Sequence, residues 1–517
     1  MNHLMTLSDA VAAHARLTPA KLAVRDSRRS LTYAQWHARA CRLANALLDR
    51  GLRKGDRVAL LAYNCAEWME LYAGLAAAGL VAVPINFRLT PAEIAFIVDH
   101  AQARAVIAQD ELADRIDAVR TELGLPDDAY IVFGRTVPGG WSGYDTLIDA
   151  ASESVPAASV SPADPSALMY TSGTTGRPKG AIRSHEGSTL IALATALEMR
   201  FTRADTALLV MPMCHANSLY FSHTFAHLGA TCVIDDRRSF DPEALLGTLA
   251  RERVTFTSLV PTHYIMMLGL PEAVKAKYDV SRVEKLMISS APARRETKLA
   301  ILEHFSNGAL YELYGSTEAG WVTLLRPEEQ IDRLGSVGRE WAGSGPIRLL
   351  DSDGHEVADG EVGELYSRTP YVFDGYWQDP AKTAEAFRGA WCSVGDMARR
   401  DADGYIHLVD RKSNMIISGG ENVYPSEVEG VIGAHPAVKD VAVVGLPDDK
   451  WGEAVHAVVV LHDGARASDA ELLDWCRGRI AGYKRPQSVR FVADAQMPRT
   501  ATGKILHRTL RDRLAAR

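Results

Sequence analysis

The sequence lacks the closely spaced cysteines that several protein classes require. It has six cysteines among 517 residues, all far apart and with no CxxC pair. Zinc ribbons, dithiol redox sites and disulfide frameworks all depend on such spacing. We therefore expect reduced thiols and a cytoplasmic protein. The cysteines are Cys41, Cys65, Cys214, Cys232, Cys392 and Cys476.

The sequence also lacks an excess of positive charge and a long apolar run. Its 57 lysines and arginines are outnumbered by 64 aspartates and glutamates, which gives a net charge of −7. This balance predicts no general attraction to nucleic acid or to anionic membranes. The most apolar stretch, residues 71–87, contains Pro84 and Asn86, so we interpret it as a buried helix entering a strand rather than an integral membrane segment. The residues that follow Met1 do not have the basic start and long apolar stretch of a secretory signal, so we do not expect one there.

What the sequence does contain is a series of short β-rich runs that alternate with helical segments. Such alternation predicts an α/β fold with mostly parallel sheets covered on both faces. A chain of this length is too long for one core, which predicts at least two domains. The clearest runs are residues 57–62, 103–108, 206–211, 231–234, 254–260 and 285–289.

The texture of the sequence changes in its last third. After residue 340, glycine-punctuated pieces such as "VGELYSR" predict β-hairpins. From Arg411 onward a new pattern of helix, two strands, helix and strand begins, over about a hundred residues, a typical size for a small domain. We place a boundary near Asp410, which gives an N-terminal domain of residues 1–410 and a C-terminal domain of residues 411–517.

Residues 170–180, "YTSGTTGRPKG", combine glycines, hydroxyl side chains and one lysine with almost nothing apolar. Glycine lets backbone N–H groups approach a ligand, and hydroxyls and an ammonium add donors, which predicts an anion cradle. The Walker pattern fails, because Pro178 precedes Lys179 and Gly180 follows it. The flanking residues are typical of a strand, a loop and a helix, an arrangement that often holds phosphate groups. A flexible surface loop is the plainer alternative.

Two further stretches could bind parts of a nucleotide. In "YGSTEAG", residues 314–320, Thr317 and Glu318 follow a strand, where a hydroxyl can bind a phosphate oxygen and a carboxylate can hold magnesium. Taken alone, this stretch could be a simple turn. Asp396 follows a glycine and is suited to holding ribose hydroxyls, although capping a turn is a fair alternative.

Two more stretches lie in the last hundred residues. Gly419 and Gly420 would let a thin ligand pass close to the backbone, or they could form a turn before the helix that starts near Pro425. Lys504 lies behind a glycine in "PRTATGKI", residues 498–505, and a lysine at such a place is usually a solvated surface charge.

The order of these motifs from residue 170 to residue 505 resembles the adenylate-forming superfamily of acyl-CoA synthetases, peptide-synthetase adenylation domains and beetle luciferases. The resemblance covers nearly the whole chain. It implies a large N-terminal domain of two α/β subdomains plus a small β-barrel, followed by a small mobile α+β domain. It also implies ATP, Mg²⁺ and coenzyme A as cofactors and a small-molecule carboxylic acid as substrate. A homodimer is compatible with the sequence.

The resemblance assigns the nucleotide-binding residues. Thr317 would contact a phosphate, Glu318 would hold magnesium, and Asp396 and Arg411 would hold the ribose. The residues that would cradle the ATP phosphates are Thr171, Ser172, Gly173, Thr174, Thr175, Gly176 and Lys179. The residues that would flank the adenine are Ser290, Ala291, Pro292, Glu312, Leu313 and Tyr314.

By the same resemblance, Lys504 would reach the reacting carboxylate and the α-phosphate, and Asp410 would be the hinge of the small domain. Attack of a carboxylate on the α-phosphate brings two anions together, so fixed cations are the expected catalysts. The resulting acyl-adenylate would then react with a thiol after the small domain turns, with release of AMP.

Several acceptors for the adenylate are open from the sequence. A peptide-synthetase domain would place an aspartate near residue 215, but "MPMCHANSLYF" contains no acid and the chain stops shortly after Lys504, which favours a free-standing ligase. Coenzyme A is the favoured acceptor, and delivery to a carrier protein is the alternative. A luciferase-like oxygenase and a noncatalytic binding protein are less favoured. The residues we assign to coenzyme A are Gly419, Gly420 and Trp451, with Lys450, Lys484 and Arg485 as further candidates for its phosphates.

The acid is the least determined part. Relatives that use acetate carry tryptophan where this chain has Gly315, which suggests room for a longer or aromatic acyl group, whereas Trp321 hints at a bounded pocket. Polar pocket residues would be wasted on a plain alkyl chain. We therefore expect an aryl or phenylpropenoid acid, with a medium- or long-chain fatty acid or a carnitine-type acid as the alternative. The predicted pocket residues are His215, Asn217, Ser218, Tyr264, Ser289, Gly315 and Trp321, of which His215 would orient the substrate.

Overall fold

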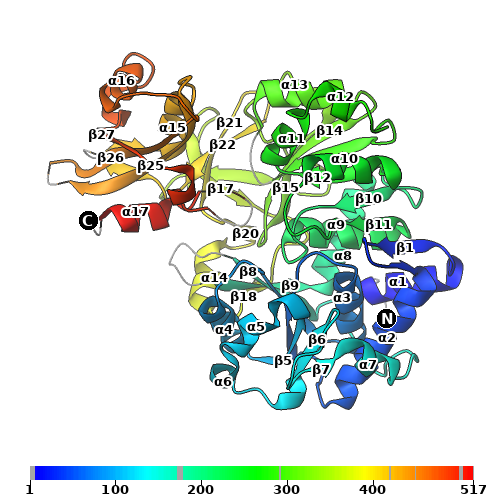
Figure 1. The fold of residues 1–517 in the computed structure, drawn as a ribbon. Helices are drawn as coiled ribbons and strands as arrows, with labels where there is room; N and C mark the ends of the chain where they lie inside the picture. The colour runs from blue at the N-terminus through cyan, green and yellow to red at the C-terminus, as the bar shows by residue number, and fades with distance from the viewer. Residues whose placement is uncertain are drawn as a thin grey trace. The chain divides into compact units, whose positions relative to one another are not determined.

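A computed structural model describes residues 6–171, 178–289, 293–418, 421–448, 450–499, 503 and 505–515. The chain divides into two compact units (Figure 1). Unit 1 comprises Met1–Pro346 and Ser367–Cys392, and unit 2 comprises Ile347–Tyr366 and Ser393–Arg517. Asp410 falls inside unit 2 by this division, and the domain boundary near it stays a prediction.

The first sheet of unit 1 has eight strands in the order β15-β14-β13-β12-β10-β11-β1-β2. Strands β1 and β10 to β14 run parallel to one another, while β2 and β15 are antiparallel edge strands. The predicted strands near residues 206, 231, 254 and 285 are confirmed. The bounds are β1 (Leu22–Arg25), β2 (Ser30–Thr32), β10 (Thr206–Leu209), β11 (Thr231–Ile234), β12 (Phe256–Leu259), β13 (Lys285–Ser289), β14 (Ala309–Ser316) and β15 (Gly320–Leu325).

The second sheet of unit 1 also has eight strands, in the order β18-β9-β8-β4-β3-β5-β6-β7. The apolar stretch at residues 71–87 forms a buried helix and then β4, as predicted. The bounds are β3 (Arg57–Leu61), β4 (Val81–Ile85), β5 (Ala103–Gln109), β6 (Tyr130–Phe133), β7 (Ser142–Gly143), β8 (Pro165–Thr171), β9 (Lys179–Ser184) and β18 (Gly375–Tyr376). A short hairpin of β19 (Phe387–Arg388) and β20 (Trp391–Cys392) also belongs to unit 1.

Helices pack on both sheets of unit 1, and Figure 1 shows α10 to α13 beside the strands of the first sheet. Within the described residues, no helix is long and apolar enough to cross a membrane. The bounds are α1 (Leu7–Leu17), α2 (Tyr33–Asp49), α3 (Glu67–Ala78), α4 (Pro91–His100), α5 (Ala113–Asp117), α6 (Arg120–Leu123), α7 (Tyr144–Asp149), α8 (His185–Glu198), α9 (Ala216–Leu228), α10 (Pro242–Arg251), α11 (Pro261–Leu268), α12 (Glu272–Lys275), α13 (Arg295–His304) and α14 (Pro380–Ala386).

The residues after the glycine-rich loop form a strand before they form a helix. Strand β9 runs antiparallel to β8, with Thr171 paired to Lys179 and Tyr170 paired to Gly180. The Ser184 side chain then caps α8. The predicted order of strand, loop and helix is therefore wrong, because residues 179–184 complete a ladder of hydrogen bonds with β8. The loop joins two antiparallel strands, so a helix N-terminus does not supply its anion-binding donors.

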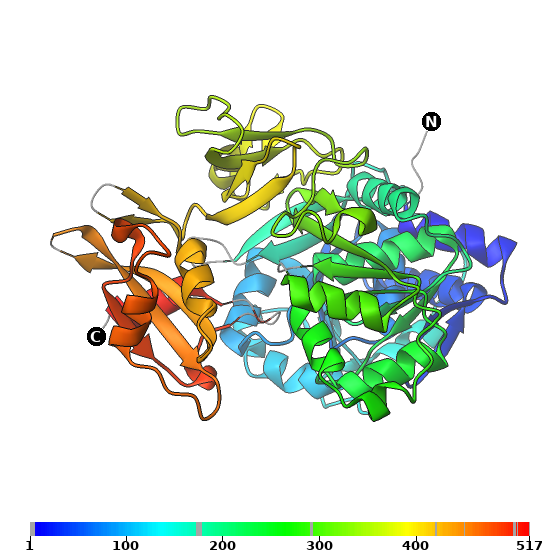
Figure 2. The ribbon, with the colours of Figure 1, turned by 90° about the horizontal axis from the view of Figure 1, so that it is seen from above.

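Unit 2 contains two groups of mostly antiparallel strands. The first consists of β16 (Ile347–Leu350), β17 (Val362–Ser367, whose last residue belongs to unit 1), β21 (Asp396–Arg400) and β22 (Ile406–Arg411). The second consists of β23 (Ile416–Ser418), β24 (Glu421–Val423), β25 (Val438–Asp448), β26 (Gly452–Leu461) and β27 (Ser488–Phe491). Helices α15 (Pro425–Gly433), α16 (Asp469–Trp475) and α17 (His507–Ala515) accompany the second group. Figure 2 shows the red helix α17 against the orange strands, where Leu510 joins a core with Val444 and Val458.

Candidate active site

The carboxyl ends of parallel strands bring several predicted site residues to one edge of the first sheet. Ser289 is the last residue of β13, and Gly315 lies at the end of β14, beside it in the sheet. His215 is the residue just before α9, the helix that follows β10, and Asn217 lies in the first turn of that helix. Ligands in open α/β sheets bind outside this edge. The topology therefore supports a common site for these residues.

Glu318 is the centre of a compact group in unit 1. Its side chain is buried, and its Oε1 accepts hydrogen bonds from the Thr171 hydroxyl at 3.2 Å and the Tyr376 hydroxyl at 2.9 Å. The Lys179 ammonium lies 4.6 Å from the centre of the Tyr376 ring. The structure thus brings together Thr171, Lys179 and Glu318, as the sequence analysis requires, and adds Tyr376, for which we found no sequence signal.

A buried arginine, Arg183, donates hydrogen bonds to the backbone of the Thr317–Glu318 turn. The Arg183 guanidinium donates to the carbonyl oxygens of Thr317 at 3.3 Å, Glu318 at 3.0 Å and Tyr371 at 2.6 Å. Arg183 is only 1% exposed, so its charge is compensated by these carbonyl dipoles. Its place in a strand of mixed polarity could have marked it as unusual, but the sequence analysis missed it.

The free oxygen of Glu318 is suited to a hard cation. Both hydrogen bonds that the described residues donate to this carboxylate go to Oε1, from two hydroxyls. Magnesium takes oxygen ligands and usually binds proteins through one or two carboxylates together with substrate phosphates. The donor set at Glu318 therefore fits the magnesium that the resemblance implies.

A group of polar side chains, Asn217, Ser258 and Ser289, lies at the same edge of the first sheet. The Asn217 amide donates through Nδ2 to the Ser258 and Ser289 hydroxyls, each at 3.0 Å, and the two hydroxyls lie 3.3 Å apart. These bonds leave the amide oxygen of Asn217 without a donor from the described residues. The sequence analysis missed Ser258, which lies next to the last residue of β12.

His215 is a neutral histidine in this structure. Burial lowers the pKa of His215 to about 4, and the charge of Arg88 contributes in the same direction. Its Nε2 is buried and has no hydrogen-bond partner among the described residues. A neutral imidazole nitrogen of this kind can orient a polar substrate group by one hydrogen bond.

Two predicted pocket residues have their hydroxyls engaged elsewhere. The Ser218 hydroxyl donates to the Met211 carbonyl at 2.6 Å, and the Tyr264 hydroxyl donates to the Met287 carbonyl at 3.1 Å. Both side chains are fully buried. These bonds favour a structural role for both residues over the substrate contacts that the sequence predicted.

Gly315 and Trp321 face each other across the β14–β15 hairpin. A Cβ atom at Gly315 would lie 2.2 Å from the Gly320 carbonyl oxygen, so the close approach of the two strands requires glycine here. Trp321 is buried, donates its Nε1 to the Thr195 hydroxyl at 2.9 Å and packs on Tyr220. Its indole is thus part of the hydrophobic core that packs against the β14–β15 hairpin.

The predicted adenine-flanking residues of β14 divide in two. Glu312 forms a fully buried ion pair with Lys298 of α13, at 2.5 Å, and burial raises the pKa of Glu312 although Lys298 opposes the shift. Leu313 is also buried, while Tyr314 is half-buried. The Glu312 side chain is therefore part of the core, whereas the Tyr314 side chain is only half-buried.

In unit 2, the predicted ribose pair is assembled. Asp396 and Arg411 are opposite each other on β21 and β22, and their side chains form an ion pair of 3.0 Å. Asp410, the predicted hinge, accepts hydrogen bonds from the Ser426 backbone N–H at 2.9 Å and the Asn414 amide at 3.1 Å. Asp410 thereby ties the end of β22 to the start of α15.

The residues predicted for coenzyme A are at the surface of unit 2. Trp451 is 40% exposed, and the Lys450 ammonium lies 4.6 Å from the centre of its ring. Lys484 forms an ion pair with Glu427 at 2.7 Å, and the Arg485 side chain donates to the Gly482 carbonyl at 3.4 Å. Trp451 is thus available for stacking, whereas Lys484 already has a carboxylate partner.

Part of the predicted site lies outside the described residues. These positions are Ser172, Gly173, Thr174, Thr175, Gly176, Ser290, Ala291, Pro292, Gly419, Gly420 and Lys504. Their roles stay predictions.

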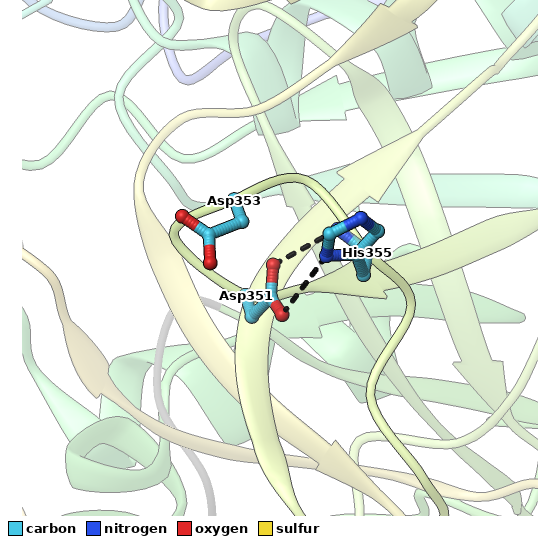
Figure 3. Close-up of side chains that lie close together, drawn as sticks. All are labelled: Asp351, Asp353 and His355. Carbon is cyan, nitrogen blue, oxygen red and sulfur yellow. Dashed lines mark hydrogen bonds and ion pairs between the residues drawn. The ribbon is translucent and has the colours of Figure 1, made fainter.

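An exposed turn of unit 2 gathers three potential metal ligands, Asp351, Asp353 and His355 (Figure 3). The Asp351 carboxylate accepts a hydrogen bond from the His355 backbone N–H at 2.9 Å, and the His355 ring lies 3.7 Å from it. This is the usual way in which an aspartate stabilises a turn. The predicted magnesium ligand, Glu318, belongs to unit 1 and is not a member of this cluster.

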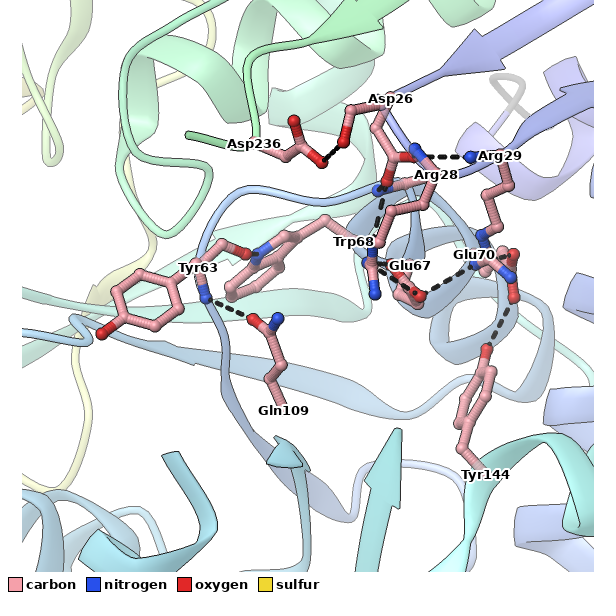
Figure 4. Close-up of polar contacts among 12 residues, drawn as sticks. Asp26, Arg28, Arg29, Tyr63, Glu67, Trp68, Glu70, Gln109, Tyr144 and Asp236 are labelled. Carbon is pink, nitrogen blue, oxygen red and sulfur yellow. Dashed lines mark hydrogen bonds and ion pairs between the residues drawn. The ribbon is translucent and has the colours of Figure 1, made fainter. Parts of the chain in front are cut away.

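A charged cavity of about 620 Å³ lies where β1 and β11 end, and the residues predicted for the site do not line it. Its arginines and carboxylates pair with one another, as in Arg25 with Glu252 at 3.0 Å. Figure 4 shows the adjoining network, in which Arg28 reaches Glu67 and the Tyr144 hydroxyl donates to the buried Glu70. This network ties the first sheet to α3, so we regard it as structural.

Family models match the chain over most of its length. The model described as AMP-binding enzyme matches residues 11–377, and the model described as AMP-binding enzyme C-terminal domain matches residues 427–504. The two matches leave the region around Asp410 between them.

Individual proteins also match nearly end to end. A feruloyl-CoA synthase from Amycolatopsis sp. is 38% identical, over 96% of this chain and 97% of the relative. An indoleacetate–CoA ligase from Aromatoleum aromaticum is 35% identical, over 97% and 96%. The solved ATP-bound structure of MatB from Rhodopseudomonas palustris is 32% identical, with a TM-score of 0.87 over 99% of both chains.

Proposed function

From the premise that this chain belongs to the family of AMP-binding enzymes and is an ATP-dependent acid–CoA ligase, we propose which acid it uses. The chain has the adenylate-forming fold. The proposed acid is an aryl or phenylpropenoid carboxylic acid of the coumarate or ferulate kind. The predicted family, fold class and enzyme class are thereby confirmed. Magnesium at Glu318, the coenzyme A contacts, a cytoplasmic location and a homodimer are part of the proposal.

The observation that carries the choice of acid is the orientation of Asn217. Its Nδ2 donates to Ser258 and Ser289, so its amide oxygen is the group left to accept a hydrogen bond. A phenolic hydroxyl or a ring N–H would satisfy this acceptor, whereas an alkyl chain would leave it unpaired at a cost of about 1–3 kcal/mol. Names of two relatives, which refer to ferulate and indoleacetate, agree with an aromatic acid bearing a donor.

The surroundings of Gly315 support an aromatic ring of limited length. Gly315 itself is exposed and adds no side chain to this edge. Trp321 behind the hairpin packs on Tyr220 and Phe221, so the interior in this direction is filled by aromatic side chains. A planar ring suits such a bounded space better than a long alkyl chain.

The residues of unit 1 would act on the phosphates and the carboxylate. Lys179 would bind phosphate oxygens of ATP, and the Thr171 hydroxyl would exchange Glu318 for a phosphate oxygen as its acceptor. Neutral His215 would orient the acid by a hydrogen bond from its ring. Glu318 would hold magnesium, which when bound neutralises phosphate charge during adenylate formation. Removing one well-placed electrostatic donor in such a site costs about 100- to 1,000-fold in rate.

The residues of unit 2 would act in both half-reactions. Asp396 and Arg411 would hold the ribose, and Lys504 would stabilise charge on the α-phosphate during adenylation. For thioester formation, Asp410 would act as the hinge that removes Lys504, and Trp451 would stack on the nucleotide part of coenzyme A.

A panel of acids tests this proposal. Acetate, octanoate, palmitate, carnitine, benzoate, cinnamate, 4-coumarate and ferulate would each be incubated with ATP, Mg²⁺ and coenzyme A, with AMP and acyl-CoA as readouts. We expect AMP and thioester with the hydroxylated aryl acids. Preference for octanoate, palmitate or carnitine would overturn the choice of acid, and pyrophosphate exchange without thioester would indicate a carrier protein as acceptor.

The Asn217→Leu variant tests the observation itself. The variant should lose its preference for 4-coumarate over cinnamate, which lacks the hydroxyl, by about 10-fold or more. The control is Asn307→Leu, an exposed asparagine of unit 1 whose amide donates only to the Ser281 carbonyl. An unchanged ratio in Asn217→Leu would mean that this amide does not face the acid.

A further inference from the structure

Backbone contacts pair the residues on either side of Lys504, and we call these paired residues the base of the Lys504 segment. Arg499 and Ile505 form an antiparallel bridge, and the Leu506 N–H donates to the Pro498 carbonyl at 2.9 Å. Lys504 therefore lies in the sequence between two described residues, Arg499 and Ile505, that are paired with each other. Met497 is buried and Ile505 partly buried in the core under β25 and β26, so the base rests on the sheet of unit 2.

Arg499 clamps the first side of this base. Its Nη2 lies 2.5 Å from the Asp440 carboxylate and 3.1 Å from the Asp494 carboxylate, and its Nη1 donates to the Gly503 carbonyl at 3.3 Å. Asp440 belongs to β25, and Asp494 is itself paired with Lys439 of that strand at 2.8 Å. A planar guanidinium can make these bonds together, which a single ammonium does with less fixed geometry.

His507 clamps the second side. It is the first residue of α17, and its Nε2 lies 2.6 Å from the Glu429 carboxylate of α15. The same Glu429 oxygen accepts the Val443 backbone N–H of β25 at 2.8 Å, so the carboxylate is fixed before it meets the histidine. The histidine and the glutamate side chains are 17% and 20% exposed, which limits screening of the pair by solvent.

We propose that Arg499 and His507 are positioning residues that hold the two ends of the Lys504 segment so that the lysine can be presented to the adenylation reaction. This inference rests on the proposed function, because it requires Lys504 to act in adenylate formation. Neither residue touches the reacting atoms in this proposal. Each acts through the short connection between them, where a displacement of about 1 Å of a catalytic group can cost 100-fold in rate.

The His507 clamp is sensitive to pH. Burial by itself would lower the pKa of His507, but the hydrogen bond and charge of Glu429, and then the charge of Asp410 on β22, raise it above its usual value. The imidazolium, and with it the ion pair, is present below this raised pKa and is lost as the pH rises through it. Adenylation should therefore decline on the alkaline side, and His507→Arg should remove that decline, because arginine stays charged.

Separating the half-reactions tests the proposal. Adenylation would be followed by ATP–pyrophosphate exchange with the best acid of the panel, and thioester formation by supplying the synthetic acyl-adenylate of that acid and coenzyme A. In Arg499→Ala and His507→Ala, exchange should fall by about 10- to 100-fold. Thioester formation should be retained, since Lys504 is expected to act only in the first step. Retention of the second step also shows that each variant folds.

Matched variants and a lysine variant complete the design. Arg477→Ala and His462→Ala remove exposed residues of unit 2 outside residues 497–507, and both should behave as wild type. Lys504→Ala should lose exchange; if it does not, the proposed role of Lys504 fails and the inference fails with it. If Lys504→Ala loses exchange but Arg499→Ala and His507→Ala keep it, or if they lose both steps equally, the positioning role alone is overturned.

Discussion

The hydroxyl of Tyr376 donates a hydrogen bond to the carboxylate of Glu318 over 2.9 Å, although the two residues are 58 positions apart. The same carboxylate oxygen accepts the Thr171 hydroxyl at 3.2 Å. Two hydroxyl donors on Oε1 fix the carboxylate and leave Oε2 as its free oxygen. Tyr376 is therefore a positioning residue for the proposed magnesium ligand.

Removing this hydroxyl should weaken the magnesium site. A hydrogen bond to a charged group contributes about 1.5–3 kcal/mol, so Tyr376→Phe should lower the rate of adenylation by roughly 10- to 100-fold. The loss should be partly recovered at high Mg²⁺, which pyrophosphate exchange across a magnesium titration would measure. The control is Tyr278→Phe, which removes a comparable hydroxyl–carboxylate bond, to Glu243, at the surface. Equal activity of the two variants would argue against the role of Tyr376.

The buried ion pair of Lys298 and Glu312 should be expensive to break. Lys298→Ala would leave the buried Glu312 carboxylate without its cation, which typically lowers the free energy of unfolding by about 3–5 kcal/mol. The double variant Lys298→Met with Glu312→Leu should recover most of the loss. Urea denaturation followed by circular dichroism measures both effects. Lys275→Ala, which breaks a pair with the exposed Glu272, is the control and should change little. A small effect of Lys298→Ala would contradict the prediction.

The stability of the protein should fall on the acid side because of His223. Burial lowers the pKa of His223 to about 3, with smaller contributions from His227 and His185. The unfolded chain binds a proton on this histidine below pH 6.5, while the folded protein does not, so the free energy of unfolding decreases as the pH falls from 6.5. The loss from this one residue should reach about 2 kcal/mol at pH 5.

The His223→Phe variant isolates this contribution. Its melting temperature should depend less on pH between 7.5 and 5 than that of the wild type. His462→Phe, a substitution of an exposed histidine, serves as the control and should leave the dependence unchanged. Parallel curves for His223→Phe and wild type would place the acid sensitivity elsewhere.

Even alanine should be poorly tolerated at Gly315. Because its Cβ would meet the Gly320 carbonyl oxygen at 2.2 Å, the β14–β15 hairpin must shift, at a cost of about 1–3 kcal/mol. Gly315→Ala should therefore lower kcat/KM for benzoate and ferulate alike. If only the larger acid were affected, the glycine would serve the size of the pocket rather than the close approach of the strands.

The sequence alone predicted the motifs and several of the strands. Short β-rich runs identified β10 to β13, and the apolar stretch at residues 71–87 was correctly interpreted as helix and strand, since both patterns depend on residues close together in the chain. The order of strand, loop and helix after Thr171 was wrong, because pairing of β9 with β8 is a contact between segments whose local pattern does not specify it. The roles of Lys504 and the glycine-rich loop stay predictions.

The sequence therefore determined which types of residue are available to the proposed reaction. The side-chain chemistry of four motif residues identified them as candidates: Lys179, His215, Asn217 and Glu318. Only the tertiary structure decided which atoms are free to act. In the structure, the hydroxyls of Ser218 and Tyr264 donate to backbone carbonyls. Glu312 is paired with Lys298. Asn217 is oriented by its bond to Ser258, and Glu318 by its bond from Tyr376. The physical reason is that a polar group removed from water must find a partner, and the available partners come from strands and helices that are distant in the sequence.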